Sequence, residues 1–478
     1  MAKKFVFTQG QERAFLKMMS FVDAPNKRVF ILKGYAGTGK TTLMKLLVEE
    51  LRKLNKRFHL LASTGRAAKV LSNITDSEAT TVHGLIYTFH DLNQDLEQLV
   101  SERERTGIDK SEQLLLNFKL NTVDRITDTS KCIYIIDEAS MISDKVDNNA
   151  TQAAFGSGRL LKDLLDYDTE GKFIFVGDIC QLPPIIQNIS PALSVDYFRK
   201  NHQMDAEEVE LTDIVRQQSG NDIVMASKKI RDLYFKCPDI KWAQFPLKKY
   251  QHIHLFPDQM SLIRSYKERI KKNGYANATL ICRSNKSCDV LTDMLRPSFG
   301  LHSSRLQKGD LLLITQNNLI SGFMNGDLVT VEEIIEERIV RANLTFVQVK
   351  VKDLNSERVY SQLLIEDILN GAQTNLTASQ QSELYIDFFL RMRKKGIKQR
   401  SELFKENMMN DVYLNALRAV YGYALTCHKA QGGEWDHVYL DIPRKIAFNP
   451  KQEVYQWLYT AMTRAKTELY LIDDFYII

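Results

Sequence analysis

The chain has 478 residues, of which 44% are hydrophobic and 26% charged, and its formal net charge is +5. This length predicts three or four domains, and the composition excludes a disordered or fibrous protein. The mild positive charge permits a nucleic-acid partner without requiring one. The sequence has no apolar run of about 18 residues, as a membrane span needs, and its first residues, MAKKFVFTQGQERAF, lack the apolar core of a secretion signal.

The six cysteines are scattered and form no CxxC motif. This spacing supports neither a zinc ribbon nor a disulfide framework. We therefore expect a reduced, cytoplasmic protein, with a nucleoid-associated or phage-encoded setting also open.

The strongest motif follows the first predicted strand, residues 29–32. The stretch GYAGTGKT fits the pattern G-x-x-x-x-G-K-[ST], and an amphipathic helix is predicted to follow it. The glycines of such a loop let backbone N–H groups surround phosphates, and the helix N-terminus adds a favourable field. We expect Lys40 to reach the β- and γ-phosphates of ATP and the Thr41 hydroxyl to bind Mg²⁺. The predicted ATP-binding residues here are Gly34, Tyr35, Ala36, Gly37, Thr38, Gly39, Lys40, Thr41 and Thr42.

Polar residues also follow the next predicted strands. The stretch HLLASTGRAAKVL places Thr64 between a strand and a helix, and EATTVHGLI places Thr81 and His83 at another element end. Polar strand ends beside an ATP site suit contacts with a nucleic-acid backbone. Plain helix capping is the alternative.

A second acidic element is predicted in KCIYIIDEASMIS, where Asp137 and Glu138 end a buried strand. At that edge of an open α/β sheet, Asp137 would hold Mg²⁺ through water and Glu138 would act as general base. A helix N-cap with an acidic first turn is the alternative. In GKFIFVGDICQLPPI, Gln181 could sense the γ-phosphate or orient water, although a Gly-Asp turn is common in itself.

The rest of the chain adds arginines and a change of pattern. Arg216 and Arg464 could enter the ATP site from a second domain, and surface ion pairing is the alternative for each. Residues 309–415 alternate with period two around an Asn-Gly hairpin signal, which predicts a small β-barrel. For the basic stretch FLRMRKKGIKQRSELF, contact with DNA phosphates and a solvated face are equally open.

The segment LTCHKAQGGEWD admits several chemistries by itself. Cys427 and His428 could form a nucleophile pair or part of a metal site, Thr426 and Lys429 could hold phosphate, and the residues from 431 to 434 could read a nucleotide. No second Cys/His cluster completes a metal site.

Ten segments in this order closely resemble those of the superfamily 1 class B DNA helicases. Within them the chain looks most like the RecD-like and phage Dda-like proteins, which are related to the petite-integration-frequency helicases. The motifs run from residue 11 to residue 466, and they are Gln11, GYAGTGKT, ASTGRAA, TTVHG, IIDEASM, GDICQLPP, LTDIVRQ, ICRSNKS, LTCHKAQGGEWD and LYTAMTRAK.

The resemblance implies a role for each matching residue. Gln11 would contact adenine, Gln181 would couple the γ-phosphate to motion, and Gly432 and Glu434 would lie toward the nucleotide, while Cys427 becomes a packing residue. The implied catalytic residues are Lys40, Asp137, Glu138, Gln181, Arg216 and Arg464, with Thr41 and Asp137 at the metal. The implied DNA-binding residues are Thr64, Thr81, His83, Asn285, Thr426, His428 and Lys429.

The resemblance also implies an α/β fold with two RecA-like motor domains. We expect motor domain 1A at 1–85 and 129–200, a β-hairpin pin 1B at 86–128, motor domain 2A at 201–308 and 416–478, and an SH3-like barrel 2B at 309–415. The stretches LIYTFHDL and LLLNFKLN would form the pin, with Phe118 and His90 as candidate wedge residues. A solvated insertion is the alternative for residues 86–128.

The expected function is that of an ATP-dependent helicase that uses Mg²⁺ and moves 5′ to 3′ on single-stranded DNA, a direction carried by resemblance alone. Expected partners are single-stranded DNA, duplex junctions and proteins of replication, recombination or repair, such as single-strand-binding proteins. Two alternatives remain: a RecD-like motor subunit of a larger nuclease complex, and an RNA-remodelling ATPase.

Overall fold

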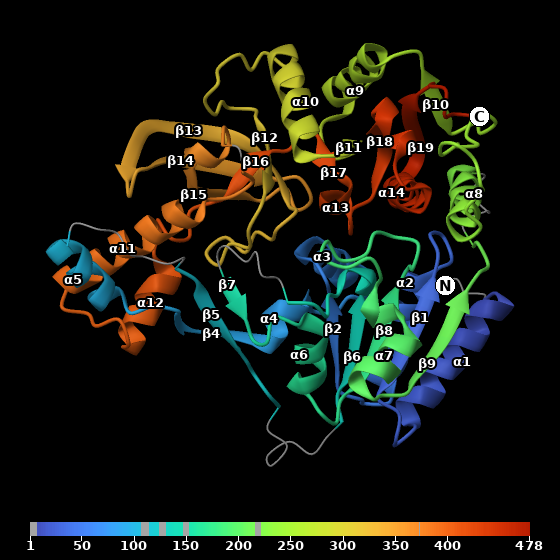
Figure 1. Cartoon of the computed structure of the whole chain (residues 1–478), viewed down its shortest axis with the longest axis horizontal. Helices are drawn as coiled ribbons and strands as arrows, with labels where there is room; N and C mark the ends of the chain where they lie inside the picture. Colours follow the sequence, from blue (N-terminus) through green and yellow to red (C-terminus); the bar gives the residue numbers. More distant parts are fainter. Residues whose placement is uncertain (1–6, 107–113, 124–130, 147–152, 216–220, 372) are drawn as a thin grey trace.

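A computed structural model describes residues 7–106, 114–123, 131–146, 153–215, 221–371 and 373–478. It has two α/β halves, one above the other in Figure 1, with two insertions extending to the left. The lower half holds a six-stranded sheet of the order β3-β2-β6-β8-β1-β9, in which every pair is parallel. Its strands are β1 (Val29–Gly34), β2 (Phe58–Ala62), β3 (Ala79–Thr81), β6 (Ile133–Asp137), β8 (Lys172–Gly177) and β9 (Ala206–Leu211).

The composition of these strands explains their central place. All six residues of β8 are buried, as expected for a parallel strand that is covered by helices on both faces. On α2, Leu43, Leu47 and Leu51 recur every four residues and turn one fully buried stripe toward the sheet. The helices of this half are α1 (Gln9–Asp23), α2 (Lys40–Lys53), α3 (Gly65–Thr75), α4 (Val82–Ile86), α6 (Leu160–Tyr167) and α7 (Val195–His202).

The upper half repeats this architecture with a five-stranded parallel sheet of the order β10-β19-β18-β11-β17. Its strands are β10 (Ile253–Phe256), β11 (Ala278–Cys282), β17 (Leu425–Thr426), β18 (Trp435–Asp441) and β19 (Ala465–Ile472). Its helices are α8 (Ile223–Phe235), α9 (Gln259–Asn273), α10 (Asn285–Ser298), α13 (Cys427–Ala430) and α14 (Lys451–Met462). Two parallel sheets, each flanked by helices, confirm the prediction of two RecA-like domains.

The first insertion contains a small sheet of the order β4-β5-β7 and one helix. Its elements are β4 (Tyr87–Leu92), α5 (Leu96–Thr106), β5 (Leu116–Leu120) and β7 (Ala153–Phe155). β4 and β5 pair antiparallel, with Phe89 opposite Phe118. The Phe118 ring stacks on Phe155 at 4.7 Å, so this candidate wedge is packed within its own sheet, whereas His90 is exposed. The wedge itself stays a prediction.

The second insertion contains an antiparallel sheet of the order β15-β14-β13-β12-β16. Two helices, α11 and α12, lie between β15 and β16 in the chain. A bridge between Leu364 and Leu417 joins the two edges of this sheet and closes it into a barrel. Its elements are β12 (Leu311–Ile314), β13 (Leu328–Arg341), β14 (Leu344–Asp353), β15 (Val359–Ile365), α11 (Ala378–Lys394), α12 (Glu402–Asn410) and β16 (Ala419–Tyr421). Whether the barrel is of the SH3 type stays a prediction.

Strand pairing corrects three predicted domain limits. β9 pairs with β1, so the first motor domain continues past residue 200. β7 pairs with β5, so the pin sheet takes a strand from beyond residue 128. β16 pairs with β12, so the barrel continues past residue 415. Each limit was misplaced because a strand that is distant in sequence completes the sheet.

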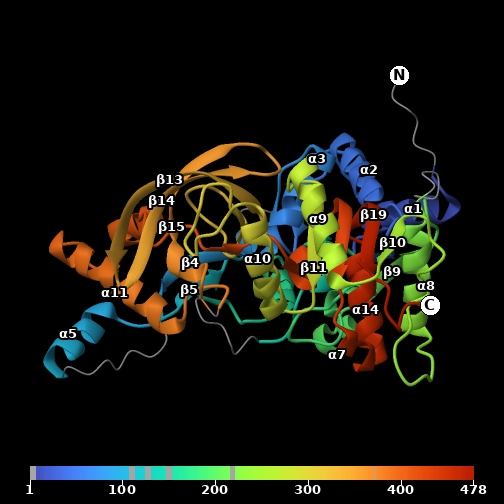
Figure 2. The same cartoon turned by 90° about the horizontal axis from the view of Figure 1, so that it is seen from above.

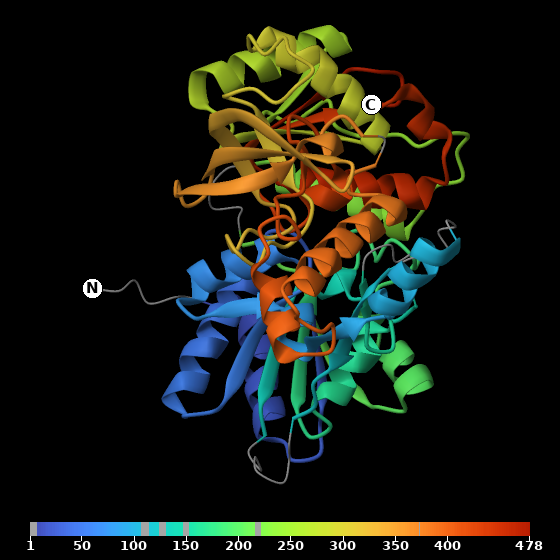
Figure 3. The same ribbon diagram turned by 90° about the vertical axis from the view of Figure 1, so that its left-hand side faces the viewer.

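The two insertions meet and form a second connection between the halves. Leu96 and Val100 of α5 share one apolar core with Leu384 and Phe388 of α11, and Figure 3 shows α5 and α11 as neighbours in front of the motor domains. Figure 2 shows the same pair at the end of the molecule that lies farthest from the motor sheets.

Surface charges add to this connection. The basic stretch that covers the end of α11 and the residues after it forms ion pairs with the first insertion, from Arg393 to Glu104 at 3.0 Å and from Arg400 to Asp95 at 3.5 Å. These pairs give two of its arginines a structural partner. Within the residues described, no helix has the length and apolar character that crossing a membrane requires.

Candidate active site

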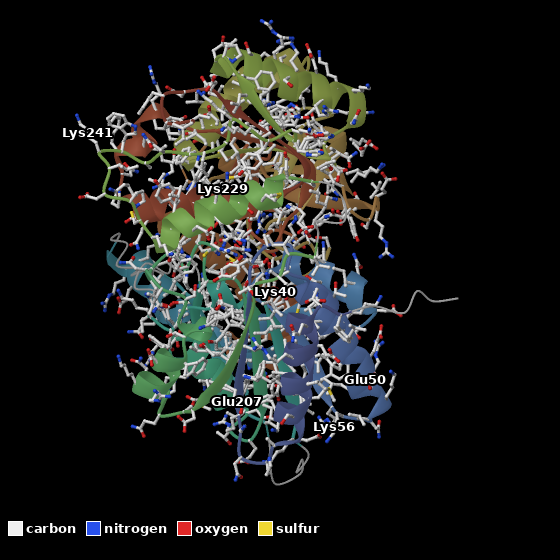
Figure 4. The ribbon with its side chains drawn as sticks, turned by 90° about the vertical axis from the view of Figure 1, so that its right-hand side faces the viewer. Lys40, Glu50, Lys56, Glu207, Lys229 and Lys241 are labelled. Carbon is white, nitrogen blue, oxygen red and sulfur yellow. The ribbon has the colours of Figure 1, made fainter. Side chains whose placement is uncertain are left out.

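The P-loop lies between β1 and α2, at the level where the two halves meet, as the position of Lys40 in Figure 4 shows. Gly37 and Gly39 have positive φ angles of 78° and 84°, which glycine adopts without strain and which turn the loop into the helix. The Lys40 ammonium donates to the carbonyl oxygens of Gly34 at 2.6 Å and Tyr35 at 3.2 Å. The strand, loop and helix that a phosphate cradle needs are therefore present together.

The predicted acidic pair ends strand β6, which is separated from β1 by β8. The Glu138 amide donates to Asp137 Oδ1 at 2.8 Å, and Glu138 itself has a positive φ of 50°, which turns its side chain out of the strand direction. Burial of the carboxyl and the neighbouring charge of Glu138 raise the pKa of Asp137. A cation beside Asp137 would offset both effects, and an oxygen ligand is what Mg²⁺ prefers.

Gln181 connects this acidic pair with the other half of the molecule. With its amide oriented to satisfy both neighbours, Gln181 donates to Glu138 Oε2 at 3.3 Å and accepts from Arg464 Nη2 at 3.0 Å. Arg464 follows α14 and is buried, with only 4% of its surface exposed. A single amide thus lies between the predicted general base of one domain and the predicted arginine finger of the other.

Arg464 is held by the backbone of its own domain. Its guanidinium donates to the carbonyl oxygens of Thr460 at 3.0 Å and Gly433 at 3.4 Å. These bonds fix a charged group next to the predicted ATP site, and among the described residues no ion pair with an acidic side chain neutralises it. Arg216, the other predicted arginine finger, lies outside the described residues.

The structure adds a residue that sequence reasoning did not assign, Tyr459 of α14. Its hydroxyl donates to Asp178 at 2.6 Å and accepts from the Ala36 amide of the P-loop at 2.9 Å. Burial raises the pKa of both Tyr459 and Asp178. The signal was its place on the helix that leads to Arg464, but the partner on the P-loop is more than 400 residues away and leaves no local pattern.

More of the loop after β8 is also bound by the second domain. Gln456 donates to the Gln181 carbonyl at 2.9 Å, the Thr460 hydroxyl accepts from the Leu182 amide at 3.0 Å, and Gln431 donates to the Leu182 carbonyl at 3.2 Å. Hydrogen bonds therefore fill this face of the junction between the two motor domains.

Gln11, predicted to contact adenine, is engaged by protein atoms. Its amide donates to the Thr38 carbonyl at 3.1 Å and accepts from the Thr8 amide at 3.1 Å, and the residue is 1% exposed. The Thr8 and Gln11 side chains form a capping box at the start of α1. Gln11 therefore supports the P-loop from behind, and its contact with adenine stays a prediction.

The threonines predicted to hold DNA are helix N-caps. The Thr64, Thr81 and Thr426 hydroxyl oxygens accept from the amides of Ala67, Gly84 and Lys429 at 3.2, 3.0 and 3.4 Å. Capping, the alternative considered for the first two, is thus real. It leaves each hydroxyl hydrogen available to a phosphate oxygen, so both roles are compatible. Asn285 is exposed and begins α10 directly after its N-cap.

The predicted basic contacts are less charged than their residue types suggest. Burial lowers the pKa of His83 to about 4, and its ring packs against Tyr87 and Phe155. Burial also lowers the pKa of His428 and Lys429. His83 and His428 would therefore contact DNA as neutral hydrogen-bonding groups rather than as cations at neutral pH.

The remaining predicted residues of the motif LTCHKAQGGEWD, Cys427, Gly432 and Glu434, differ in their burial and in their neighbours. Cys427 is 1% exposed, and its thiol lies 3.7 Å from the Trp457 carbonyl, which agrees with a packing role. Gly432 lies against the start of α3, where a Cβ on it would be 3.1 Å from Thr64 Oγ1, and its approach to ATP stays a prediction. Glu434 is exposed.

The assembled groups suit a magnesium–nucleotide complex. Lys40 and the backbone amides of the P-loop suit phosphate oxygens, while the Thr41 hydroxyl and the Asp137 carboxylate are hard oxygen donors for Mg²⁺. When bound, Mg²⁺ neutralises charge on the transferred phosphoryl group. Glu138 lies next to the Gln181 amide, and its role as general base stays a prediction.

Two family profiles match the chain in the regions of the two motor domains. The AAA domain profile matches residues 7–236, and the UvrD-like helicase C-terminal domain profile matches residues 421–472. These two spans contain the P-loop, the acidic pair, Gln181 and Arg464.

The relatives are distant in sequence and differ in length. The ATP-dependent DNA helicase Dda of Enterobacteria phage T4 is 23% identical over 97% of this chain and 99% of its own. The ATP-dependent RecD2 DNA helicase of Deinococcus radiodurans is 24% identical over 93% of this chain, which spans 46% of that relative.

Among solved structures, a Bacteroides Pif1 helicase in complex with ADP-AlF3 and single-stranded DNA aligns over 99% of this chain and 93% of its own, with a TM-score of 0.50 and 17% identity. This likeness concerns the fold. Because the matched profiles cover both motor regions and the named relatives align with nearly the whole chain, the chain belongs to the RecD- and Dda-like superfamily 1B helicases, which hydrolyse ATP.

Proposed function

We propose that the chain unwinds duplex DNA by moving 5′ to 3′ along single-stranded DNA, with each step driven by hydrolysis of Mg-ATP in the cleft between the motor domains. The observation that carries the proposal is the contact of Gln181 with Glu138 on one side and Arg464 on the other. Because Gln181 touches both the predicted base and the predicted arginine finger, its position changes when the phosphates between them change. Gln181 itself belongs to the first domain, in the loop after β8.

The hydrolytic roles follow from this geometry. Lys40 and Thr41 hold the phosphates and the metal together with Asp137, and Glu138 takes the proton of the attacking water. Arg464 stabilises charge that develops on the transferred phosphoryl group, because it is preorganised by the carbonyl oxygens of its own domain.

Movement follows from the placement of the DNA-facing groups on both halves. Thr64, Thr81 and His83 belong to the first domain, while Asn285 and Thr426, with the adjacent His428 and Lys429, belong to the second. ATP binds the closed arrangement more tightly than the open one, so binding and hydrolysis alternately shorten and lengthen the distance between the two sets. Contacts of this kind address the sugar-phosphate backbone, so they are largely indifferent to base sequence.

The decisive experiment is strand displacement on duplexes that carry a single 5′ or a single 3′ tail. We expect ATP-dependent unwinding from the 5′-tailed substrate alone. Unwinding from the 3′ tail alone reverses the proposed polarity, and ATP turnover without unwinding from either tail favours a motor subunit that needs partner chains.

Two accompanying measurements separate the remaining possibilities. Stimulation of ATP turnover by single-stranded DNA but not by RNA supports the DNA assignment, because the 2′-hydroxyl can be sensed locally. Glu138→Gln is expected to bind ATP with near-normal affinity and to turn it over at least a hundredfold more slowly. Retained turnover removes Glu138 from the role of general base.

A further inference from the structure

Arg66 and Trp435 form a contact between the two motor domains. Neither residue has been assigned to ATP binding, catalysis or DNA contact. Arg66 lies in the first turn of α3 in the first domain, and Trp435 begins β18 in the second. The guanidinium carbon of Arg66 lies 4.2 Å from the centroid of the Trp435 ring, which is close for a cation–π contact. The indole is 2% exposed, so the contact is screened little by water.

The two glycines before Trp435 make room for this stack. A Cβ on Gly433 would come within 2.8 Å of the Arg66 guanidinium carbon and 2.6 Å of the Trp435 ring. A Cβ on Gly432 would come within 3.1 Å of Thr64 Oγ1. A side chain at Gly433 would therefore crowd the stack of Arg66 on Trp435, and one at Gly432 would press against the start of α3.

The guanidinium is buried but not fixed by hydrogen bonds on every side. Among the described residues, its Nη1 has no hydrogen-bond partner. Charged groups of two neighbouring elements act on the Arg66 guanidinium. Asp327 and Asp353 of the barrel attract it, and Arg464 of the second motor domain repels it. Both aspartates lie near Lys69, with its ammonium closest to Asp327. The planar guanidinium can thus shift across the indole face without breaking a salt bridge of its own.

Trp435 is also joined directly to the ATP site. Its amide donates to the Arg464 carbonyl at 2.9 Å, and the Arg464 guanidinium donates to the Gly433 carbonyl at 3.4 Å. Because Arg464 also contacts Gln181, a continuous series of contacts runs from Glu138 through Arg464 and Trp435 to Arg66, two residues beyond Thr64.

We propose that Arg66 is a positioning residue that transmits movement of Arg464, by way of the Trp435 ring, to the DNA-facing start of α3. The inference rests on the proposed helicase function and deepens it, since it names the contact that links hydrolysis to the grip on DNA. Neither side chain touches the reacting atoms. Loss of the contact separates ATP turnover from unwinding and leaves turnover itself intact.

Arg66→Lys is the critical variant, because lysine keeps the charge and loses the planar face. We expect basal ATP turnover within twofold of the unchanged protein and an approximately tenfold increase in ATP consumed per base pair opened, which corresponds to a contact of about 1.4 kcal/mol. Lys241→Ala is the matched control: it removes a cation 6.0 Å from the ring of Trp242, far from the junction in Figure 4, and leaves the ratio unchanged. Equal losses of turnover and unwinding in Arg66→Lys indicate a purely structural role and overturn the proposal.

A spectroscopic readout tests the contact directly. The chain has three tryptophans, so Trp242→Phe and Trp457→Phe together leave Trp435 as the only indole reporter. We expect its emission to change when a non-hydrolysable ATP analogue and single-stranded DNA are added, and the change to be at least halved by Arg66→Lys. An identical response in both proteins refutes the inference. If the unchanged chain neither unwinds DNA nor hydrolyses ATP faster with it, the proposed function fails instead, and the emission response to the analogue alone still decides whether Arg66 and Trp435 move together.

Discussion

Two of the junctions between the halves of the molecule differ in the kind of contact that they make. At the predicted ATP site the junction is polar: Tyr459 accepts a hydrogen bond from the P-loop, and Gln181 bonds to both Glu138 and Arg464. At the far end, between α5 and α11, it is apolar, with Leu96 and Phe388 both fully buried in one core.

The polar junction can rearrange, whereas the apolar junction is expected to stay closed. A hydrogen bond can be exchanged for another of similar energy when a phosphate or a water arrives, so the polar junction has several states of similar free energy. The apolar core has no comparable alternative partner, because separating it exposes hydrocarbon to water. We therefore expect the distal contact to hold while the polar junction at the ATP site rearranges.

Lys40→Ala tests the polar junction with the largest expected effect. It removes the ammonium directed at the phosphates, and we expect ATP turnover to fall by roughly a thousandfold or more, about 4 kcal/mol in the activation free energy. Steady-state ATP hydrolysis with saturating single-stranded DNA measures it. Lys33→Ala, which removes a lysine of β1 that pairs with Glu208, is the control and retains turnover. Substantial activity in Lys40→Ala would dissociate the P-loop from hydrolysis.

Leu96→Ala tests the apolar junction. Leu96 is fully buried, and truncation of such a leucine costs about 2–5 kcal/mol, because transfer free energy is lost and a cavity is left. We expect the amides of α5 to exchange hydrogen faster in the variant, as measured by mass spectrometry, and unwinding to decline more than ATP turnover. Leu16→Ala on α1 removes the same group from a leucine that is 62% exposed and is expected to change stability by less than about 0.5 kcal/mol. Unchanged exchange in α5 would show that the core contributes little to the junction.

The two junctions also differ in how far they could be predicted from the sequence. The P-loop is a contiguous motif, and so is the pair Asp137 and Glu138. The strand, loop and helix start that surround the P-loop are encoded within about 15 residues, so local sequence is sufficient to predict them. Arg464 and Gln181 were assigned by resemblance. Tyr459 was not, because its partner Ala36 lies far away in sequence and nothing near either residue signals the pairing.

The same reason explains the errors in domain limits and the missing distal junction. β9 and β16 each complete a sheet that began much earlier, and periodicity within a strand does not say which sheet it joins. The core shared by α5 and α11 forms only when two amphipathic faces meet. For the basic residues at the end of α11 and after it, the sequence left contact with DNA and a solvated face equally open. Their pairing with Glu104 and Asp95 became visible only in the folded chain.

Tyr459→Phe sharpens the polar side of the comparison with an intermediate effect. The variant removes the hydroxyl shared by Asp178 and the Ala36 amide and leaves a buried carboxylate with one donor fewer, a loss of about 1.5 kcal/mol or somewhat more. We expect ATP turnover to fall about tenfold while DNA binding without nucleotide is unaffected. Tyr455→Phe, one turn earlier on α14, removes a hydroxyl that accepts from Gln244 and is the matched control. Equal effects of the two variants would mean that the P-loop contact has no special weight.

Arg393→Ala has the smallest expected effect and separates the two components of the distal junction. Arg393 and Glu104 form an ion pair at 3.0 Å, but their side chains are 42% and 59% exposed, so water and salt screen the attraction. A double-mutant cycle with Glu104→Gln, read as the stability of α5 to hydrogen exchange, should give a coupling free energy of less than about 1 kcal/mol that disappears at high salt. A coupling as large as the effect of Leu96→Ala would mean that charge rather than hydrocarbon holds the insertions together. The junction would then weaken with ionic strength, and unwinding would show a salt dependence beyond that of DNA binding itself.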